Sequence, residues 1–182
     1  MNRPSDATSE QLTAAYATGD LSPVEAIRSV LDRIDEWEPR INAMFLVHRE
    51  AALAAARESE QRWRRGEPRS PLDGVPITIK ENIHTRGDLA PIGTAATPDV
   101  VQPQDAPPAA RAREAGCVII GKTTMPDYGM LSSGISSRHG ITRNPWRLDR
   151  NTSGSSSGAA AACTAGYGPL HIGTDIGGSV RL

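Results

Sequence analysis

Apolar residues in the first third of the chain recur at helical spacing. Ser22, followed by proline and then by Glu25, forms a capping box, which marks the start of a helix. The same signature at Thr8 and Gln11 predicts a shorter helix that ends at Gly19, and the alanine-rich residues 51–63 predict a third helix. The helix that begins after Ser22 has one apolar face, formed by Ile27, Val30, Leu31, Ile34 and Trp37.

The pattern changes after about residue 67, where short β-branched runs replace the helical spacing. Residues 75–79 and 117–120 are apolar runs bounded by glycine, which is typical of buried strands. Residues 107–115, between them, predict a helix with proline near its start and glycine after its end. Residues 123–148 carry many turn residues and predict irregular structure. The order strand, helix, strand favours an α/β core with at least one parallel pair.

Composition limits the classes of partner and location. The 182 residues suffice for one domain, and 20 basic and 21 acidic residues leave a net charge of −1. This balance does not favour direct binding of nucleic acid or of an anionic membrane. No apolar run approaches the ~18 residues of a membrane span. We therefore expect a cytoplasmic protein that contacts neither nucleic acid nor membrane.

Two segments match known motifs without the context that those motifs need. Residues 116–123 fit the P-loop pattern, but 117–120 have the composition of a strand where a flexible turn is required. We interpret them as a strand bounded by glycine, with Lys122 at the surface. Residues 154–158 fit the nucleophile elbow around Ser156, but that motif follows a strand, and we interpret 147–153 as a polar loop.

A third group of residues comes from three separated segments. Lys80 ends the first predicted strand, where α/β sheets tend to place their chemistry. Ser155 lies in a loop rich in serine and glycine, and Ser179 follows a pair of glycines. Paired glycines let several backbone N–H groups converge on one point, and amide hydrolysis needs such donors where the carbonyl oxygen becomes an oxyanion.

These segments resemble the amidase-signature family. Residues 153–158 match its serine- and glycine-rich loop, and residues 173–181, Gly-Thr-Asp-Ile-Gly-Gly-Ser-Val-Arg, match its second glycine-rich turn without a gap. Residues 72–82 are similar to the family's lysine strand, and 121–128 and 142–146 are similar to two further landmarks. The resemblance extends from about Gln11 to Leu182. Ser153 and Ser157 depart from it, because the family usually has glycine at both positions.

The resemblance implies a mechanism. Ser179 would be the nucleophile that forms an acyl-enzyme, and Ser155 would pass its proton to Lys80, which burial must keep neutral. In the family, the bond that corresponds to Gly154–Ser155 is cis. No metal or cofactor is required. Backbone N–H groups would bind the oxyanion, namely those of Ile176, Gly177, Gly178 and Ser179, and the supporting residues would be Gly154, Ser156, Thr174, Asp175 and Arg181.

The fold implied is the three-layer α/β/α amidase-signature fold with a mixed central sheet, present here only in its N-terminal part. Residues 1–66 would form the helical N-terminal region and 67–182 the start of the α/β catalytic core, with the C-terminal remainder missing. We expect the isolated chain to be poorly folded or inactive, because strands that lose a neighbour expose apolar edges.

The function implied is hydrolysis of a small-molecule carboxylic amide to a carboxylate and ammonia or an amine. Two alternatives stay open. One is the A subunit of a glutamine-dependent tRNA amidotransferase, which shares these residues and hands ammonia to a partner protein. The other is a truncated, inactive remnant. The residues identify neither the amide nor the oligomeric state.

Overall fold

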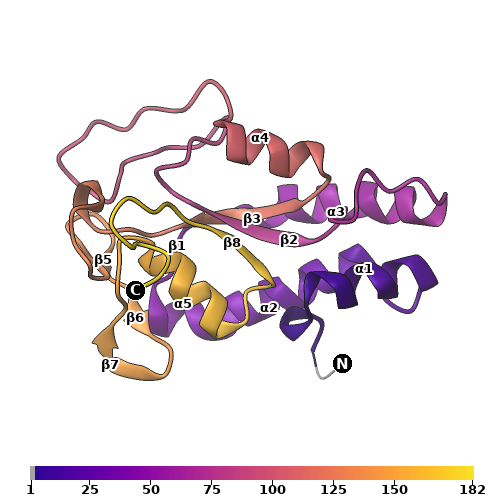
Figure 1. Ribbon diagram of the computed structural model, residues 1–182, viewed down its shortest axis with the longest axis horizontal. Helices are drawn as coiled ribbons and strands as arrows, with labels where there is room; N and C mark the ends of the chain where they lie inside the picture. The colour runs from indigo at the N-terminus through magenta and orange to yellow at the C-terminus, as the bar shows by residue number, and fades with distance from the viewer. Residues whose placement is uncertain (1–2) are drawn as a thin grey trace.

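The computed structural model describes residues 3–182, and its centre is a four-stranded mixed sheet (Figure 1). The strand order is β1-β3-β2-β8. β3 and β8 both run parallel to β2, whereas β1 is antiparallel to β3. The predicted parallel pair is confirmed as β2 and β3. The strands are β1 (Met44–Val47), β2 (Pro76–Lys80), β3 (Val118–Thr123) and β8 (Leu170–Ile172).

Helices pack on both faces of this sheet and give three layers (Figure 1). On one face, α2, α3 and α5 share a buried apolar cluster with Val118 and Ile120 of β3. On the other face, α4 packs on Ile77 and Ile79 of β2. A smaller cluster joins α1 to the start of α2. The helices are α1 (Ser9–Thr18), α2 (Pro23–Ile41), α3 (Arg49–Arg64), α4 (Pro107–Glu114) and α5 (Ser157–Ala165), with 3-10 turns at Pro4–Asp6 and Asp127–Gly129.

Local side-chain chemistry explains where the first two helices begin. The Thr8 and Ser22 hydroxyls accept hydrogen bonds from the backbone N–H groups of Gln11 and Glu25, at 3.3 and 3.1 Å. The side chains of Gln11 and Glu25 accept in return from the backbone N–H groups of Thr8 and Ser22. Both predicted capping boxes are therefore confirmed. Gly19 ends α1 with a φ of 78°, a left-handed conformation that favours glycine.

The middle of the chain is more regular than its composition predicts. Within 123–148, β4 (Ile135–Ser136) pairs with β5 (Gly140–Ile141). β6 (Arg143–Asn144) pairs with β7 (Arg147–Asn151), which begins in this range and continues beyond it. The interpretation of 147–153 as a loop is thus wrong for its first five residues. β7 is exposed along its whole length, so its sequence lacks the apolar alternation by which a half-buried strand is recognised.

Lys122 also differs from its prediction. Residues 118–123 do form a strand, as expected, but the Lys122 side chain is fully buried rather than at the surface. Its Nζ donates to the carbonyl of Ile83 and, at 2.8 Å, to Thr85 Oγ1. These acceptors lie in the segment after β2 and could not be assigned from the sequence of β3.

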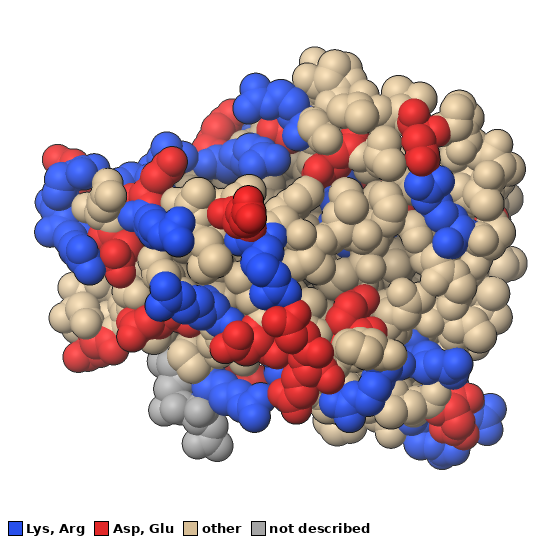
Figure 2. Space-filling view, turned by 180° about the vertical axis from the view of Figure 1, so that it is seen from behind, with Lys and Arg blue, Asp and Glu red and all other residues tan. Residues whose placement is uncertain are grey.

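Charged side chains mix over the surface. On the face seen in Figure 2, arginines and acidic residues alternate over one end, and the other end is mostly uncharged. Opposite charges form many exposed ion pairs, such as Arg3 with Glu36 at 2.9 Å and Arg111 with Glu114 at 2.7 Å. No helix within residues 3–182 is both long and apolar enough to cross a membrane.

One buried ion pair ties α3 to the turn before β2, and its loss should destabilise the fold. Arg62 donates to both oxygens of Asp73, at 2.7 Å each, and the Asp73 side chain is 0% exposed. Burial would raise the pKa of Asp73, but Arg62 and the backbone N–H of Arg69 hold it below its ordinary value. Arg62→Met leaves this carboxylate buried and unpaired, so we expect a loss of about 3–5 kcal/mol in the free energy of unfolding.

The measurement is urea unfolding of the unmodified protein and of the Arg62→Met and Arg64→Met variants. Arg64→Met is the matched control, since Arg64 lies on the same helix with a side chain that is 72% exposed and forms an ion pair with Glu60 at 3.2 Å. An exposed pair of this kind contributes about 0–1 kcal/mol. Equal losses in the two variants would show that the Arg62–Asp73 pair has no special role.

Candidate active site

Three chain segments meet at the carboxyl ends of β2 and β8. Lys80 is the last residue of β2, Ser155 lies just before α5, and Ser179 follows β8. Because β2 and β8 are parallel neighbours, their carboxyl ends reach the same edge of the sheet (Figure 1). α5 packs on both strands, so the loop before it also reaches this edge.

The three side chains form one continuous hydrogen-bonded path. Lys80 Nζ lies 2.8 Å from Ser155 Oγ, and Ser155 Oγ lies 3.0 Å from Ser179 Oγ. Ser155 is 5% exposed, whereas Ser179 is half-buried at the open end of the path. A hydroxyl both donates and accepts, so Ser155 can carry a proton between the other two groups in either direction.

Lys80 loses its proton at a lower pH than an exposed lysine does. Its side chain is 0% exposed, and burial lowers its pKa to about 8, against the opposing effect of the Glu81 and Asp175 carboxylates. Its amine also contacts Ser156 Oγ at 3.2 Å and Thr174 Oγ1 at 2.8 Å. Around pH 8 a share of the Lys80 amines is neutral and can accept a proton, whereas an exposed lysine of ordinary pKa stays protonated.

The loop around Ser155 is packed tightly against backbone. The peptide bond Gly154–Ser155 is cis. A Cβ on Gly154 would lie 2.6 Å from the Ser133 carbonyl oxygen, and one on Gly158 would lie 2.4 Å from Thr124 N, so both positions exclude a side chain. Ser157 is buried, and its hydroxyl donates to the Ser133 carbonyl at 3.3 Å. The serine that replaces the family's usual glycine here is therefore accommodated by a hydrogen bond.

The turn after β8 is fixed by an ion pair. Arg181 donates to both Asp175 oxygens, at 2.8 and 3.0 Å, and this holds the pKa of Asp175 well below its usual range. Asp175 Oδ1 also accepts from the backbone N–H of Gly178 at 2.8 Å. Of the four backbone N–H donors that the family resemblance implies, that of Gly178 is thus already engaged. Those of Ile176, Gly177 and Ser179 have no hydrogen-bond partner within residues 3–182.

The structure brings the predicted site residues into one region, and one neighbour was missed. Ser156 Oγ accepts from Thr174 N at 3.3 Å and donates to Thr174 O at 3.2 Å, so the two supporting residues link the loop and the turn. Sequence reasoning did not single out Glu81, whose fully buried carboxylate acts on Lys80. Its place directly after Lys80 was the only signal.

Comparison with known proteins agrees with this arrangement. The model of the family described as Amidase matches residues 25–182. The chain belongs to the amidase family. This confirms the resemblance of its loop and turn segments to amidase-signature enzymes.

Solved amidase structures share the fold. A crystal structure of an amidase aligns with a TM-score of 0.88 at 31% identity, over 95% of this chain and 39% of that one. The native peptide amidase from Stenotrophomonas maltophilia aligns with a TM-score of 0.82 at 32% identity, over 90% of this chain and 35% of that one. The three-layer α/β fold with a mixed sheet is therefore the amidase fold, of which this chain spans part.

Curated relatives carry one recurring name. The A subunit of the glutamyl-tRNA(Gln) amidotransferase of Symbiobacterium thermophilum is 43% identical over 172 residues, which are 94% of this chain and 35% of that protein. The protein of the same name from Chloroflexus aggregans is 44% identical over 167 residues, which are 92% of this chain and 34% of that protein. The chain thus spans about a third of the length of the curated relatives it matches.

Proposed function

We propose that this chain carries the catalytic residues of an amide hydrolase that works through a serine acyl-enzyme. The observation that carries the proposal is the path from buried Lys80 through Ser155 to Ser179, with distances of 2.8 and 3.0 Å. A serine hydroxyl is a weak nucleophile at its own pKa and needs a base within hydrogen-bond reach. A desolvated lysine with a pKa of about 8 meets that need.

In the proposed reaction, Ser179 Oγ attacks the amide carbonyl carbon. Its proton moves to Ser155 Oγ while the Ser155 proton moves to neutral Lys80 Nζ. The resulting oxyanion would accept hydrogen bonds from the unpaired N–H groups of Ile176, Gly177 and Ser179. Gly178, already bonded to Asp175, would shape the turn instead.

The same path then runs in reverse. Lys80 returns its proton through Ser155 to the leaving nitrogen, the C–N bond breaks, and an ester on Ser179 remains. A water molecule, deprotonated along the path, attacks this ester and releases the carboxylate. Ser179 regains its proton and Lys80 is neutral again. The roles of these residues are parts of the proposal. So is the division into a helical region 1–66, which also contributes β1 to the sheet, and a catalytic region 67–182.

A second function is favoured by the relatives. The A subunits of glutamyl-tRNA(Gln) amidotransferases match 92–97% of this chain at 38–44% identity. The alternative proposal is that the whole protein hydrolyses glutamine and passes ammonia to a partner protein. Amide turnover that requires both glutamine and a partner would favour it over a free-standing amidase. A cytoplasmic location stays a prediction under either proposal.

The test is covalent labelling with a fluorophosphonate, which traps a serine nucleophile as a stable phosphonyl ester. We expect one label per molecule, found by peptide mass spectrometry on Ser179, and no label on heat-unfolded protein. Ammonia release from simple amides, with and without glutamine, is measured in parallel. A label on Ser155 or Ser156 would reassign the nucleophile. The absence of both labelling and turnover would favour the inactive remnant.

A further inference from the structure

Lys122 carries a buried amine that the proposed mechanism does not use. Its side chain is 0% exposed, and its Nζ donates to the Ile83 carbonyl and, at 2.8 Å, to Thr85 Oγ1. Both acceptors lie in the segment that follows Lys80. Within residues 3–182, no other group donates to the Ile83 carbonyl. Lys122 therefore supplies a hydrogen bond that this segment would otherwise lack, and a buried carbonyl without a donor is costly.

The segment held in this way, residues 81–85, is the turn that directly follows β2. The backbone N–H of Glu81 donates to the Thr123 carbonyl at 3.1 Å, and that of Ile83 donates to the Lys80 carbonyl at 3.0 Å. The Ile83 side chain packs in the apolar cluster beneath α4. Backbone bonds thus fasten the start of the 81–85 turn to β3, and one lysine amine fastens the rest.

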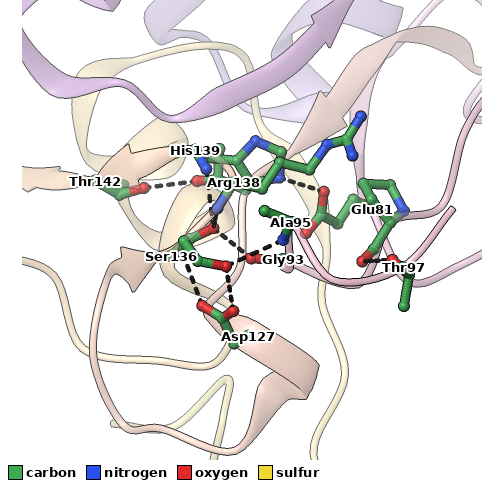
Figure 3. Close-up of polar contacts among 12 residues, drawn as sticks. Glu81, Gly93, Ala95, Thr97, Asp127, Ser136, Arg138, His139 and Thr142 are labelled. Carbon is green, nitrogen blue, oxygen red and sulfur yellow. Dashed lines mark hydrogen bonds and ion pairs between the residues drawn. The ribbon is translucent and has the colours of Figure 1, made fainter. Parts of the chain in front are cut away.

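The first residue of the 81–85 turn has a separate attachment, which Figure 3 shows. Glu81 Oε2 lies 2.7 Å from His139 Nε2, and both side chains are buried. The backbone N–H of His139 donates in turn to Ser136 Oγ at 3.0 Å, within the β4–β5 loop. This attachment does not involve Lys122. Loss of the Lys122 amine should therefore free the later residues of the turn more than Glu81.

The Thr85 hydroxyl links the Lys122 amine to a carboxylate. Thr85 Oγ1 accepts from Lys122 and donates at 2.6 Å to Asp88 Oδ2, which lies 3.0 Å from His48 Nε2. One hydroxyl can do both, because it has one proton and two lone pairs. A buried amine needs such acceptors, since burial of a polar group without hydrogen bonds is costly. The hydrogen bonds from Lys122 therefore belong to a network that continues beyond the turn.

Lys122 lies on the opposite face of the sheet from the candidate active site. It pairs with Ile79 in the parallel register, and Ile79 packs on the α4 side. Lys80 follows Ile79 in β2, so its side chain points to the other face, where it contacts Ser155 at 2.8 Å. Any influence of Lys122 on Lys80 must therefore pass through the backbone of the turn that joins them.

We propose that Lys122 is a positioning residue, which anchors the 81–85 turn and so holds the end of β2 where the Lys80 amine reaches Ser155. This role deepens the proposed function and rests on it for its effect on turnover. The anchoring itself is a property of the fold and is measurable without turnover. A displacement of about 1 Å at a catalytic group can cost about 10²-fold in rate. Loss of the anchor should therefore slow the reaction although every group of the catalytic path remains.

The first measurement is hydrogen exchange of the whole protein, read by mass spectrometry on the peptide that contains residues 80–85. Lys122→Met keeps a similar volume and removes both hydrogen bonds, so the Ile83 amide should exchange about tenfold faster. Leu31→Ala is the matched control, because Leu31 is buried in the α2 cluster and does not contact the turn by a hydrogen bond. Any increase that it causes should not be confined to residues 80–85. Unchanged exchange of this peptide in Lys122→Met would overturn the proposal.

The second measurement is amide turnover per active molecule. A fluorophosphonate label, taken to completion, counts the molecules with a folded site, so that unfolded protein does not enter the rate. Per labelled molecule, Lys122→Met should lower kcat by about 10-fold to 100-fold and change KM by less than about twofold. Leu31→Ala should keep the rate of the unmodified protein. A normal kcat per labelled molecule in Lys122→Met would overturn the positioning role.

Two variants of Thr85 test the same contact from its other side. Thr85→Val removes the acceptor with little change in shape, whereas Thr85→Ser keeps the hydroxyl. Turnover per labelled molecule should fall in Thr85→Val, and Thr85→Ser should recover most of that loss. If Lys122→Met fails to fold, this pair decides, since equal turnover in the two Thr85 variants contradicts the proposal.

The two proposals fail in different ways. If the whole protein shows no amide turnover but exchange at residues 80–85 rises selectively in Lys122→Met, the proposed function fails and the anchoring of the turn stands. If the unmodified protein turns over amides but Lys122→Met changes neither exchange nor kcat, the positioning role fails and the proposed function stands.

Discussion

In the whole protein, replacing Ser179 with alanine is expected to lower amide turnover by about 10⁴-fold to 10⁶-fold, since a covalent path cannot proceed without its nucleophile. The hydroxyl of Ser179 ends the path from Lys80, and alanine removes only one oxygen from a half-buried site. The fold should therefore persist. Initial rates of ammonia release, together with a thermal melt of the same sample, measure the two effects separately.

Ser132→Ala is the matched control, because the Ser132 side chain is exposed and takes no part in the path from Lys80 to Ser179. Its rate should equal that of the unmodified protein. A Ser179→Ala variant that keeps more than a tenth of the turnover would remove Ser179 from its proposed role. If the variant is already unfolded at the assay temperature, the loss of activity would instead be due to unfolding.

Lys80→Met is expected to lower kcat/KM by about 10²-fold to 10⁴-fold, the range attributed to a general base. Methionine fills a similar volume in the buried position, so the loss reflects the missing amine. Lys80→Arg is the sharper comparison, because arginine keeps a positive charge but cannot accept a proton. Both variants should be impaired alike. An active Lys80→Arg would mean that the site needs a cation and not a base.

The pH dependence follows from the same amine. The pKa of Lys80 is about 8, below its ordinary value because of burial. Below that pH the amine is protonated and cannot accept the Ser155 proton, so kcat/KM of the unmodified protein should rise with pH through about 8. The rise should be absent in Lys80→Met. Rates measured from about pH 6 to 10 on a substrate that does not itself titrate would check both expectations.

Features of the fold with a local signal were predictable from the sequence. The capping residues Thr8 and Ser22 act within one turn of their helices, and both helix starts were predicted correctly. β1 and β8 were not predicted, because they have four and three residues and are only partly buried. Short runs of this kind lack the alternation that identifies a strand.

The candidate site likewise has features that could be predicted from the sequence and features that could not. Lys80, Ser155 and Ser179 were found because their segments resemble a known family, and the structure brings the three together. Burial of Lys122 could not be read from β3 alone, because its partners come from the segment after β2. The bond from Gly178 to Asp175 was equally hidden, since it depends on how the turn closes.

The burial of both lysines has a consequence for surface chemistry. Reagents that modify exposed lysine side chains find neither Lys80 nor Lys122 accessible while residues 3–182 keep this fold. The extent of modification at either lysine would therefore measure the fraction of molecules in which this part of the protein has unfolded. The exposed side chains of the Lys and Arg class in this part of the protein are all arginines. Acetylation or ubiquitination of lysine side chains therefore has no target within residues 3–182 while they stay folded.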